Sequence, residues 1–183
     1  MFPLTLREAK GSPLTHQEMD NNLKHVMFPP FLHIQDQKPQ GTNGGTFTSG
    51  AWWTRDLNTV LTNTIVGASL ANNRITLPAG KYYVEASAVA QWVNRNTTRL
   101  YDMTGTTLLE GLAVQSYFVD TGNSSACYPA SLNGQFIISS ESILELQHIC
   151  QRTANDRGFG VSTNLTTEVY SDIRIWRIGE YEE

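Results

Sequence analysis

The stretch "GKYYVEASAVAQWV", residues 80–93, decides the fold of this chain. Every second residue from Tyr82 to Trp92 is apolar or small, and the intervening positions include Lys81 and Glu85. A period of two indicates a β-strand with one buried face. The turn signal "PAG" stands just before it. We therefore predict an extended strand over residues 80–93 whose Tyr82 face lies in the core.

The sequence on both sides of this strand has the same texture from residue 31 onward. Thr, Ser, Asn, Gly, Val, Ile and aromatic residues dominate, and these favour strands and turns over helices. The further candidate strands are residues 31–37, 46–58, 63–70, 73–77, 97–114, 126–139, 142–151 and 168–179. About eight to ten short strands at spacings near ten residues predict an all-β protein, an antiparallel β-sandwich or jelly roll.

One short helix is predicted before the first strand. Thr15 and Glu18 have the spacing of a capping box, which marks the start of a helix, and "FPPF" stops the helix after about three turns. Its apolar stripe, Met19, Leu23 and Val26, is too thin to form a core. The stripe needs a partner surface, which is either the rest of the chain or further copies of the helix.

Composition excludes several classes of function. The chain has 183 residues and a net charge of −4, and this negative charge does not favour binding to nucleic acid or to an anionic membrane. No stretch is long and apolar enough for a membrane span, and residues 1–10 do not form a signal peptide. We therefore expect cytoplasmic synthesis and no membrane insertion.

No cofactor or metal site is expected either. The sequence lacks a phosphate-binding glycine loop, an H-E-x-x-H motif and a G-x-S-x-G motif, and its four histidines do not cluster. Cys127 and Cys150 have no metal-ligand spacing, and in a reducing compartment they are expected to be buried free thiols. A disulfide between them is the alternative.

The segment around the predicted helix resembles a recurrent N-terminal segment of bacteriophage tail-fibre and related virion proteins. That segment has the form K-G-(S/A)-P-L-T-H-x-E-M-D-x-N. Here it consists of Lys10, Gly11, Ser12, Pro13, Leu14, Thr15, His16, Glu18, Met19, Asp20 and Asn22. The resemblance covers about a tenth of the chain and implies that residues 1–14 attach to a virion. It also implies that three copies of Met19, Leu23 and Val26 bury one another.

Residues 31–179 resemble phage fibre head domains and the tumour-necrosis-factor and complement-type jelly roll. Gly80, Tyr82 and Val84 match the central strand of that fold, and "IRIWRIG" matches its last strand. The resemblance implies a compact trimer in which the last strand runs close to the threefold axis. Several strands with apolar residues on both faces also call for a subunit interface. Ile173 and Ile175 are therefore expected at the trimer seam.

Three regions follow from these patterns. Residues 1–30 are the predicted virion-docking segment with its trimerising helix, residues 31–179 the jelly-roll head domain, and residues 180–183 a tail. The predicted protein is a homotrimeric fibre or tail-tip protein of the virion, held by a baseplate, tail or capsid protein through its N-terminus. Its head binds a host-surface receptor, a glycan. The alternatives are a purely structural head fibre, collar or decoration protein, and a small polysaccharide depolymerase.

An enzyme is not expected. A glycosidase needs two carboxyl groups across a sugar cleft. The head-domain carboxylates stand in no recognisable catalytic frame: Asp102, Glu110, Asp120, Glu141, Glu145, Asp156, Glu168 and Asp172. His148 lies on a Leu/Leu/Cys face and is read as a core or axis residue. Trp92 and Trp176 fit strand patterns, whereas the roles of Trp53 and Arg55 stay open.

Receptor binding is assigned to loops, because a rigid sandwich presents recognition residues there. If strands alternate in direction, the turns at 94–97 and 139–142 lie at one end and the loops 120–125 and 153–159 at the other. The second set is longer and more polar. Its candidate receptor-binding residues are Asn123, Ser124, Asn155, Asp156 and Arg157.

Overall fold

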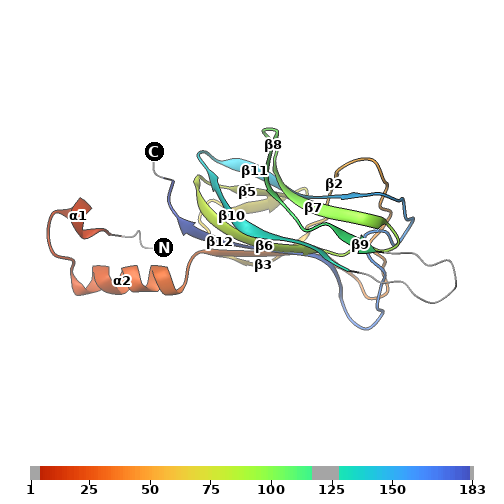
Figure 1. Ribbon diagram of the computed structural model, residues 1–183. Coiled ribbons are helices and arrows are strands. Elements are labelled where there is room, and N and C mark those ends of the chain that lie inside the picture. Colours follow the sequence, from red (N-terminus) through yellow and green to blue (C-terminus); the bar gives the residue numbers. More distant parts are fainter. Residues whose placement is uncertain (1–4, 117–127, 182–183) are drawn as a thin grey trace.

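The computed structural model describes residues 5–116 and 128–181, with His25 and Val26 described by their backbone alone. Two helices precede the strands of a β-sandwich (Figure 1). In chain order the elements are α1 (Arg7–Lys10), α2 (His16–Met27), β1 (Phe31–Lys38), β2 (Trp53–Thr54), β3 (Thr59–Asn63), β4 (Ser69–Ala71), β5 (Arg74–Leu77), β6 (Gly80–Ala88), β7 (Asn94–Asp102), β8 (Thr106–Glu110), β9 (Val114–Ser116), β10 (Ala130–Ile138), β11 (Ser142–Cys150) and β12 (Glu168–Gly179).

The strands form two sheets that stack face to face (Figure 1). The five-stranded sheet has the order β10-β6-β12-β1-β3, and the seven-stranded sheet has the order β4-β5-β11-β7-β8, with β2 on β11 and β9 on β7. Neighbouring strands are antiparallel, and the first strand pairs with the last. The predicted all-β jelly roll is confirmed.

The core lies between the two sheets. Tyr82 and Val84 of β6 are fully buried, and Leu144 and Leu146 of β11 face them from the other sheet at 0% exposure. Burying one such side chain stabilises the fold by about 1.5–3 kcal/mol. The alternation that predicts the inward face of β6 is therefore correct.

The strand at residues 80–93 is shorter than predicted. β6 ends at Ala88, and Trp92 has a left-handed backbone, with φ of 61°. The chain then enters β7, where Asn96 pairs with Cys150 of β11. The predicted turn at 94–97 is therefore part of a strand. It lies at the same end of the sandwich as the loop 153–160, not with the turn at 139–142.

The last strand, β12, also differs from the prediction. Ile173 and Ile175 are completely buried in the core of a single chain. Both faces of this strand carry large apolar residues in the sequence, so the pattern does not reveal which face points inward. The outward face carries Asp172, Arg174 and Trp176 instead. Ile173 and Ile175 consequently do not line a seam between copies.

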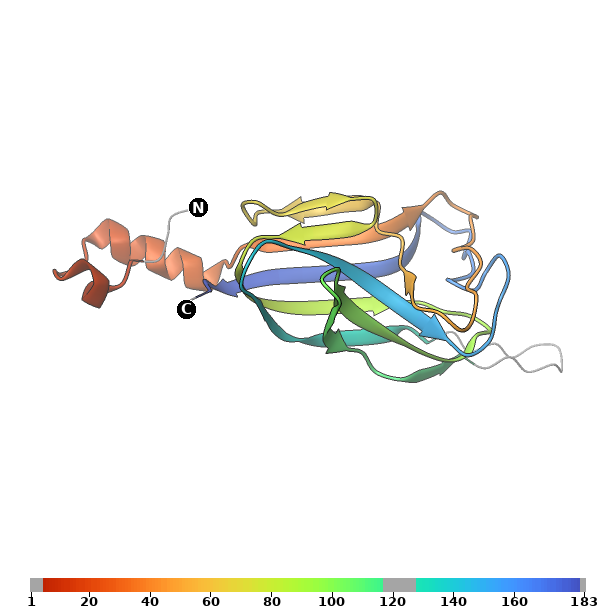
Figure 2. The same ribbon diagram turned by 90° about the horizontal axis from the view of Figure 1, so that it is seen from above.

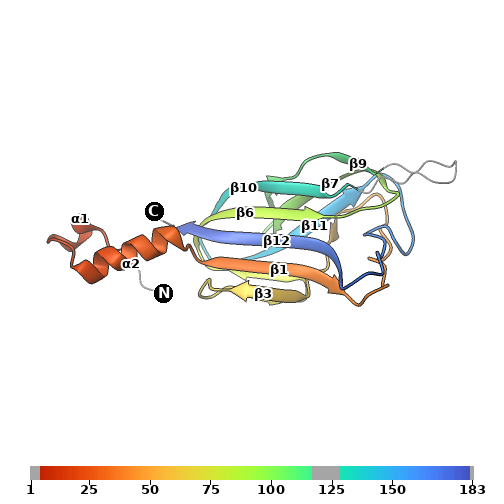
Figure 3. The same ribbon diagram turned by 90° about the horizontal axis from the view of Figure 1, so that it is seen from below.

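The two ends of the sandwich are built differently. At the helix end, α2 leads into β1 beside the end of β12 (Figure 3). At the opposite end, which we call the loop end, residues 39–52, 89–93 and 151–167 connect the sheets (Figure 2). The helix α2 begins at His16, directly after the predicted Thr15–Glu18 capping box, whose two reciprocal hydrogen bonds are present. One extra turn, α1, precedes it and is not predicted by the sequence.

Candidate functional site

The two long segments of the loop end are joined by backbone hydrogen bonds. Phe47 and Ala154 exchange both of theirs at 3.0 Å, and the Gly45 N–H donates to the Asp156 carbonyl at 2.9 Å. The Gly44 N–H donates to the Gly160 carbonyl at 2.9 Å. Segment 39–52 therefore supports segment 151–167 along its length, although the two are about a hundred residues apart in the chain.

Glycine makes this close approach possible. A Cβ atom at Gly158 would lie 2.7 Å from the Phe47 Cβ atom, and one at Gly44 would lie 2.6 Å from the Phe159 carbonyl carbon. Contacts this short are not tolerated, so a side chain at either position would push the two segments apart. The glycine-rich stretch 41–45 is thus a packing surface in addition to a loop.

A second apolar cluster lies beneath these segments. It consists of Phe47, Ala90, Val93, Cys150 and Ala154, with Trp92 and Phe159 packed against it. Cys150 is a buried free thiol, as predicted, and burial raises its pKa to about 11. It is therefore protonated at neutral pH. Cys127 lies outside the described residues.

Arg55 is the central buried polar group of the loop end. It is 1% exposed, and its guanidinium lies 4.3 Å from the centre of the Phe159 ring. Its Nη2 donates to the carbonyl oxygens of Tyr170 and Phe159, and its Nε donates to Ser171 Oγ at 2.8 Å. Arg55, left open by the sequence, therefore ties the start of β12 to segment 151–167.

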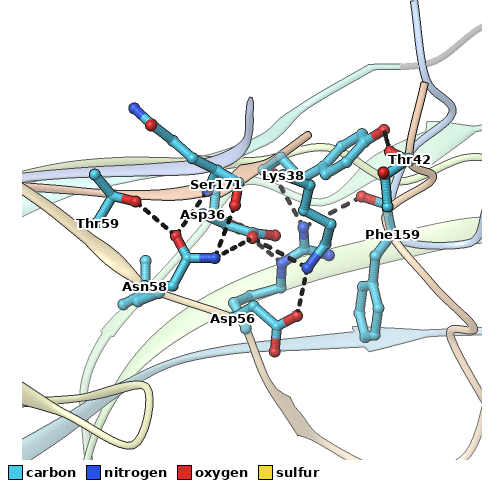
Figure 4. Close-up of polar contacts among 12 residues, drawn as sticks. Asp36, Lys38, Thr42, Asp56, Asn58, Thr59, Phe159 and Ser171 are labelled. Carbon is cyan, nitrogen blue, oxygen red and sulfur yellow. Dashed lines mark hydrogen bonds and ion pairs between the residues drawn. The ribbon is translucent and has the colours of Figure 1, made fainter. Parts of the chain in front are cut away.

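Asp36 and Asp56 form an acidic pair around Lys38 (Figure 4). Lys38 Nζ lies 3.2 Å from an Asp36 oxygen and 2.8 Å from an Asp56 oxygen, and Asn58 Nδ2 donates to Asp36. Desolvation raises the pKa of the buried Asp36 carboxyl above its usual value, although Lys38 opposes the shift. Because both carboxylates share one lysine, this group holds β1 to the segment before β3.

The predicted receptor-binding residues lie at the exposed tip of this framework. Asn155 and Asp156 are exposed, and the Arg157 guanidinium lies 5.1 Å from the centre of the Trp92 ring. Asp156 is more constrained than expected, since its Oδ2 accepts from Asn43 Nδ2 at 2.6 Å and its N–H donates to Thr46 Oγ1. The predicted residues Asn123 and Ser124 lie outside the described residues.

Glu168 anchors the far side of segment 151–167. Its carboxylate accepts from the backbone N–H groups of Thr163, Asn164 and Gly41. Backbone hydrogen bonds from Thr163 and its neighbours lower the pKa of this carboxyl, so it stays charged. The loop is consequently held at its base by Arg55, at its tip by Asn43 and at its end by Glu168.

The loop end can bind a ligand by hydrogen bonds from side chains that are held in place by contacts within the protein. The carboxylates of Asp36, Asp56, Asp156 and Glu168 each engage partners within the protein. Among the described residues, no group of three His, Cys, Asp or Glu side chains is placed to hold a metal ion. The exposed side chains of Asn155 and Asp156 and the partly buried guanidinium of Arg157 suit a polar ligand.

The helix end is a second candidate site. Asn22 of α2 clamps the preceding chain, because its side chain accepts from the Thr5 N–H at 2.9 Å and donates to the Thr5 carbonyl at 2.8 Å. Lys10 forms an ion pair with Glu18, and Gly11 ends α1 in a left-handed conformation. The hydrogen bond from Lys10 and that from the Thr15 backbone lower the Glu18 pKa to about 2.

This clamp leaves apolar side chains in water. The exposed set at the helix end is Leu6, Met19, Leu23, Met27 and Phe28, with exposed fractions from 41% to 70%. The described residues thus leave Met19 and Leu23 exposed, which disfavours the interpretation in which the stripe packs on its own sandwich. The side chain of Val26 lies outside the description. Among the described residues, no helix has the length and apolar character needed to cross a membrane.

Sequence comparisons find no matching family model and no matching curated protein. The structure, by contrast, is similar to Eiger, a tumour necrosis factor from S. frugiperda, with a TM-score of 0.55 and 15% identity over 85% of this chain and 96% of that one. It is also similar to murine APRIL at pH 5.0, with a TM-score of 0.51 and 10% identity over 81% and 98% of the two chains. These likenesses show a tumour-necrosis-factor-like jelly roll.

Proposed function

We propose that this chain is a homotrimeric bacteriophage fibre or tail-tip protein whose head domain binds a host-surface glycan. The observation that carries the proposal is the helix end, where a self-contained clamp presents an uncovered apolar stripe on α2. The residues that build the clamp, Lys10, Gly11, Glu18 and Asn22, are those through which the segment resembles virion proteins. The protein would therefore reside in the assembled virion.

Three copies of α2 side by side would cover Met19 and Leu23. The outer face of the five-stranded sheet extends this surface into the head, because an aromatic cluster stands at its helix end. Trp176 lies 4.9 Å from Phe31 and 5.8 Å from Tyr83, measured between ring centres. The trimer seam is thus assigned to Met19, Leu23 and this aromatic cluster, in place of Ile173 and Ile175.

The loop end lies at the end of the sandwich away from the helices, and this location supports the receptor role. Residues 1–30 would hold the baseplate, tail or capsid protein, so the loops at the far end of the sandwich would face away from the particle (Figure 3). Residues 155–157 are held in place by contacts inside one chain, which reduces the entropy that binding must overcome. A role without catalysis fits the carboxylates, since those of the loop end engage internal partners.

The test is binding of the purified protein to host cells and to their extracted glycans. Three weak sites on one trimer raise the apparent affinity by about 10²–10⁴, so the assembled protein should bind far better than a dissociated one. Arg157→Gln should weaken binding without lowering the melting temperature. Arg7→Gln, the same change of charge at the helix end, should leave cell binding intact.

The outcomes separate the alternatives. A folded trimer that binds no cells of a host that the virus infects would favour a structural head fibre, collar or decoration protein. Release of reducing ends from capsular polysaccharide would indicate a depolymerase. Cell binding that requires Arg157 but releases no sugar is the result that the proposal predicts.

A further inference from the structure

A second polar cluster lies on the outer face of the seven-stranded sheet, away from the loop tips. Leu100 and Leu146 point into the core at 0% exposure, so their strand neighbours Arg99 and Gln147 point outward. Arg99 and Gln147 are direct cross-strand partners. Trp52, which precedes β2, covers Arg99 from one side. The cluster therefore combines side chains from distant parts of the chain on one flat surface.

The Arg99 guanidinium is fixed in position. Its central carbon lies 4.1 Å from the centre of the Trp52 ring and 4.3 Å from that of Tyr101. Its Nε donates to Gln147 Oε1 at 2.8 Å and its Nη1 to Thr107 Oγ1 at 3.1 Å. An arginine held in this way loses little rotational freedom when it binds a ligand.

A buried carboxylate supports this arrangement from below. Gln147 Nε2 donates to Glu145 at 2.6 Å, and Thr54 and Arg74 donate to the same carboxylate at 2.8 Å each. Burial opposes ionisation of Glu145, but these three hydrogen bonds outweigh it and lower its pKa. The chain of contacts thereby sets the orientation of the Gln147 amide and, through it, the direction of Arg99.

Arg99 has no acidic partner among the residues that the structure describes. Arg74, Arg174 and Arg177 each lie within 4.0 Å of a carboxylate oxygen, whereas no described ion pair includes Arg99. Two of its five N–H donors are used in the hydrogen bonds described above. Arg99 is thus a partly buried, preoriented cation with three N–H donors that these hydrogen bonds do not use.

We propose that the Arg99 cluster binds the carboxylate of an acidic saccharide, such as a uronic acid. The guanidinium fork matches a carboxylate in a two-point hydrogen bond, and stacking on Trp52 and Tyr101 holds the fork in place. This inference deepens the proposed glycan-binding role and rests on it, but it assigns a site separate from residues 155–157.

The structure also supplies an internal control. Glu110 stands opposite Arg99 in the β7–β8 ladder, is exposed, and forms none of the described ion pairs. Its negative charge opposes the approach of an anion. Glu110→Gln should therefore strengthen binding of the acid by about two- to fivefold. If the charge of the ligand did not contribute to binding, the affinity would stay unchanged in this variant.

The experiment is a calorimetric and NMR titration of the whole protein with oligogalacturonate and, as the neutral match, its methyl ester. The acid should bind, and binding should weaken with added salt. Arg99→Gln should weaken it at least about tenfold. Arg95→Gln removes an exposed arginine from the same strand and should change nothing. If Arg99→Gln fails to fold, Arg99→Lys keeps the charge but not the fork, and should lose part of the affinity.

Equal binding of the acid and its ester, unchanged affinity in Arg99→Lys or Arg99→Gln, or no binding of the acid would overturn the inference. Host-cell binding that persists in folded Arg99→Gln would overturn it as the receptor site while leaving the proposed function intact. Binding of oligogalacturonate through Arg99 by a protein that binds no host cells would support the site and contradict the receptor role.

Discussion

The helix end and the loop end of the molecule differ in how many of their apolar and polar groups are buried or hydrogen-bonded within one chain. At the loop end, Phe47 and Arg55 are at most 1% exposed, and residues far apart in sequence meet each other's hydrogen-bonding needs. At the helix end, contacts are local, and Leu23 and Phe28 are 60% and 70% exposed. The described part of the loop end is therefore held by contacts within one chain, whereas the helix end keeps large apolar side chains exposed.

The largest effect on stability is expected at Arg55. Arg55→Met removes the donor to the Phe159 carbonyl and the Ser171 hydroxyl and leaves the Tyr170 carbonyl with the Val89 N–H alone. It should lower the free energy of unfolding by about 3 kcal/mol or more, as measured by chemical denaturation. Arg95→Met, at an exposed position, should change it by less than about 0.5 kcal/mol. Equal effects of the two substitutions would show that the loop end is not held by Arg55.

A smaller effect is expected from pH, through His148. This side chain is fully buried against Phe47, its Nε2 lies 2.9 Å from Asn96 Oδ1, and its Nδ1 has no partner among the described residues. Burial, with a contribution from the positive charge of Arg55, holds its pKa well below 6.5. The unfolded chain therefore binds the proton first.

Stability should consequently be constant above pH 6.5 and fall as the pH drops from 6.5 to 5, by at most about 1.4 kcal/mol per pH unit. Denaturation series at several pH values measure this slope. His148→Gln cannot titrate, so its slope in the same window should be close to zero. A wild-type slope of zero, or an equal slope in the variant, would contradict the assignment to His148.

The smallest effect on the sandwich is expected at the helix end. Leu23→Asp places a charge at a position that is 60% exposed, so the sandwich should keep its unfolding free energy within about 0.5 kcal/mol. Self-association should nevertheless be lost, because an unpaired charge is costly to bury between helices. Circular dichroism melts report the first quantity, and sedimentation reports the second. Unfolding of the sandwich in this variant would mean that α2 belongs to the main core.

The sequence predicts the parts of the fold that rest on local patterns. The start of α2 follows from Thr15 and Glu18, and the inward face of β6 follows from its alternation. Long-range contacts escape this reasoning. The left-handed backbone at Trp92 depends on its packing in the folded protein. β12 has apolar residues on both faces, and its packing against the other sheet decides which face is buried.

The candidate site shows the same division. Polar residues in a loop indicate that Asp156 is exposed, but not that Asn43, 113 residues away in the chain, fixes it by a hydrogen bond. Arg55 carries no local sign of burial, since its partners are mainly backbone carbonyls of residues far along the chain. The Arg99 cluster likewise depends on the pairing of β7 with β11.

The central claim is that the helix end is completed by two further copies of the chain. Multi-angle light scattering of the full chain at micromolar concentration, alone and as Leu23→Asp, tests it most directly. The claim predicts three times the protomer mass of 20.4 kDa for the wild type and a lower mass for the variant. A stable monomer in the wild type, or a Leu23→Asp variant that remains fully trimeric, would contradict it.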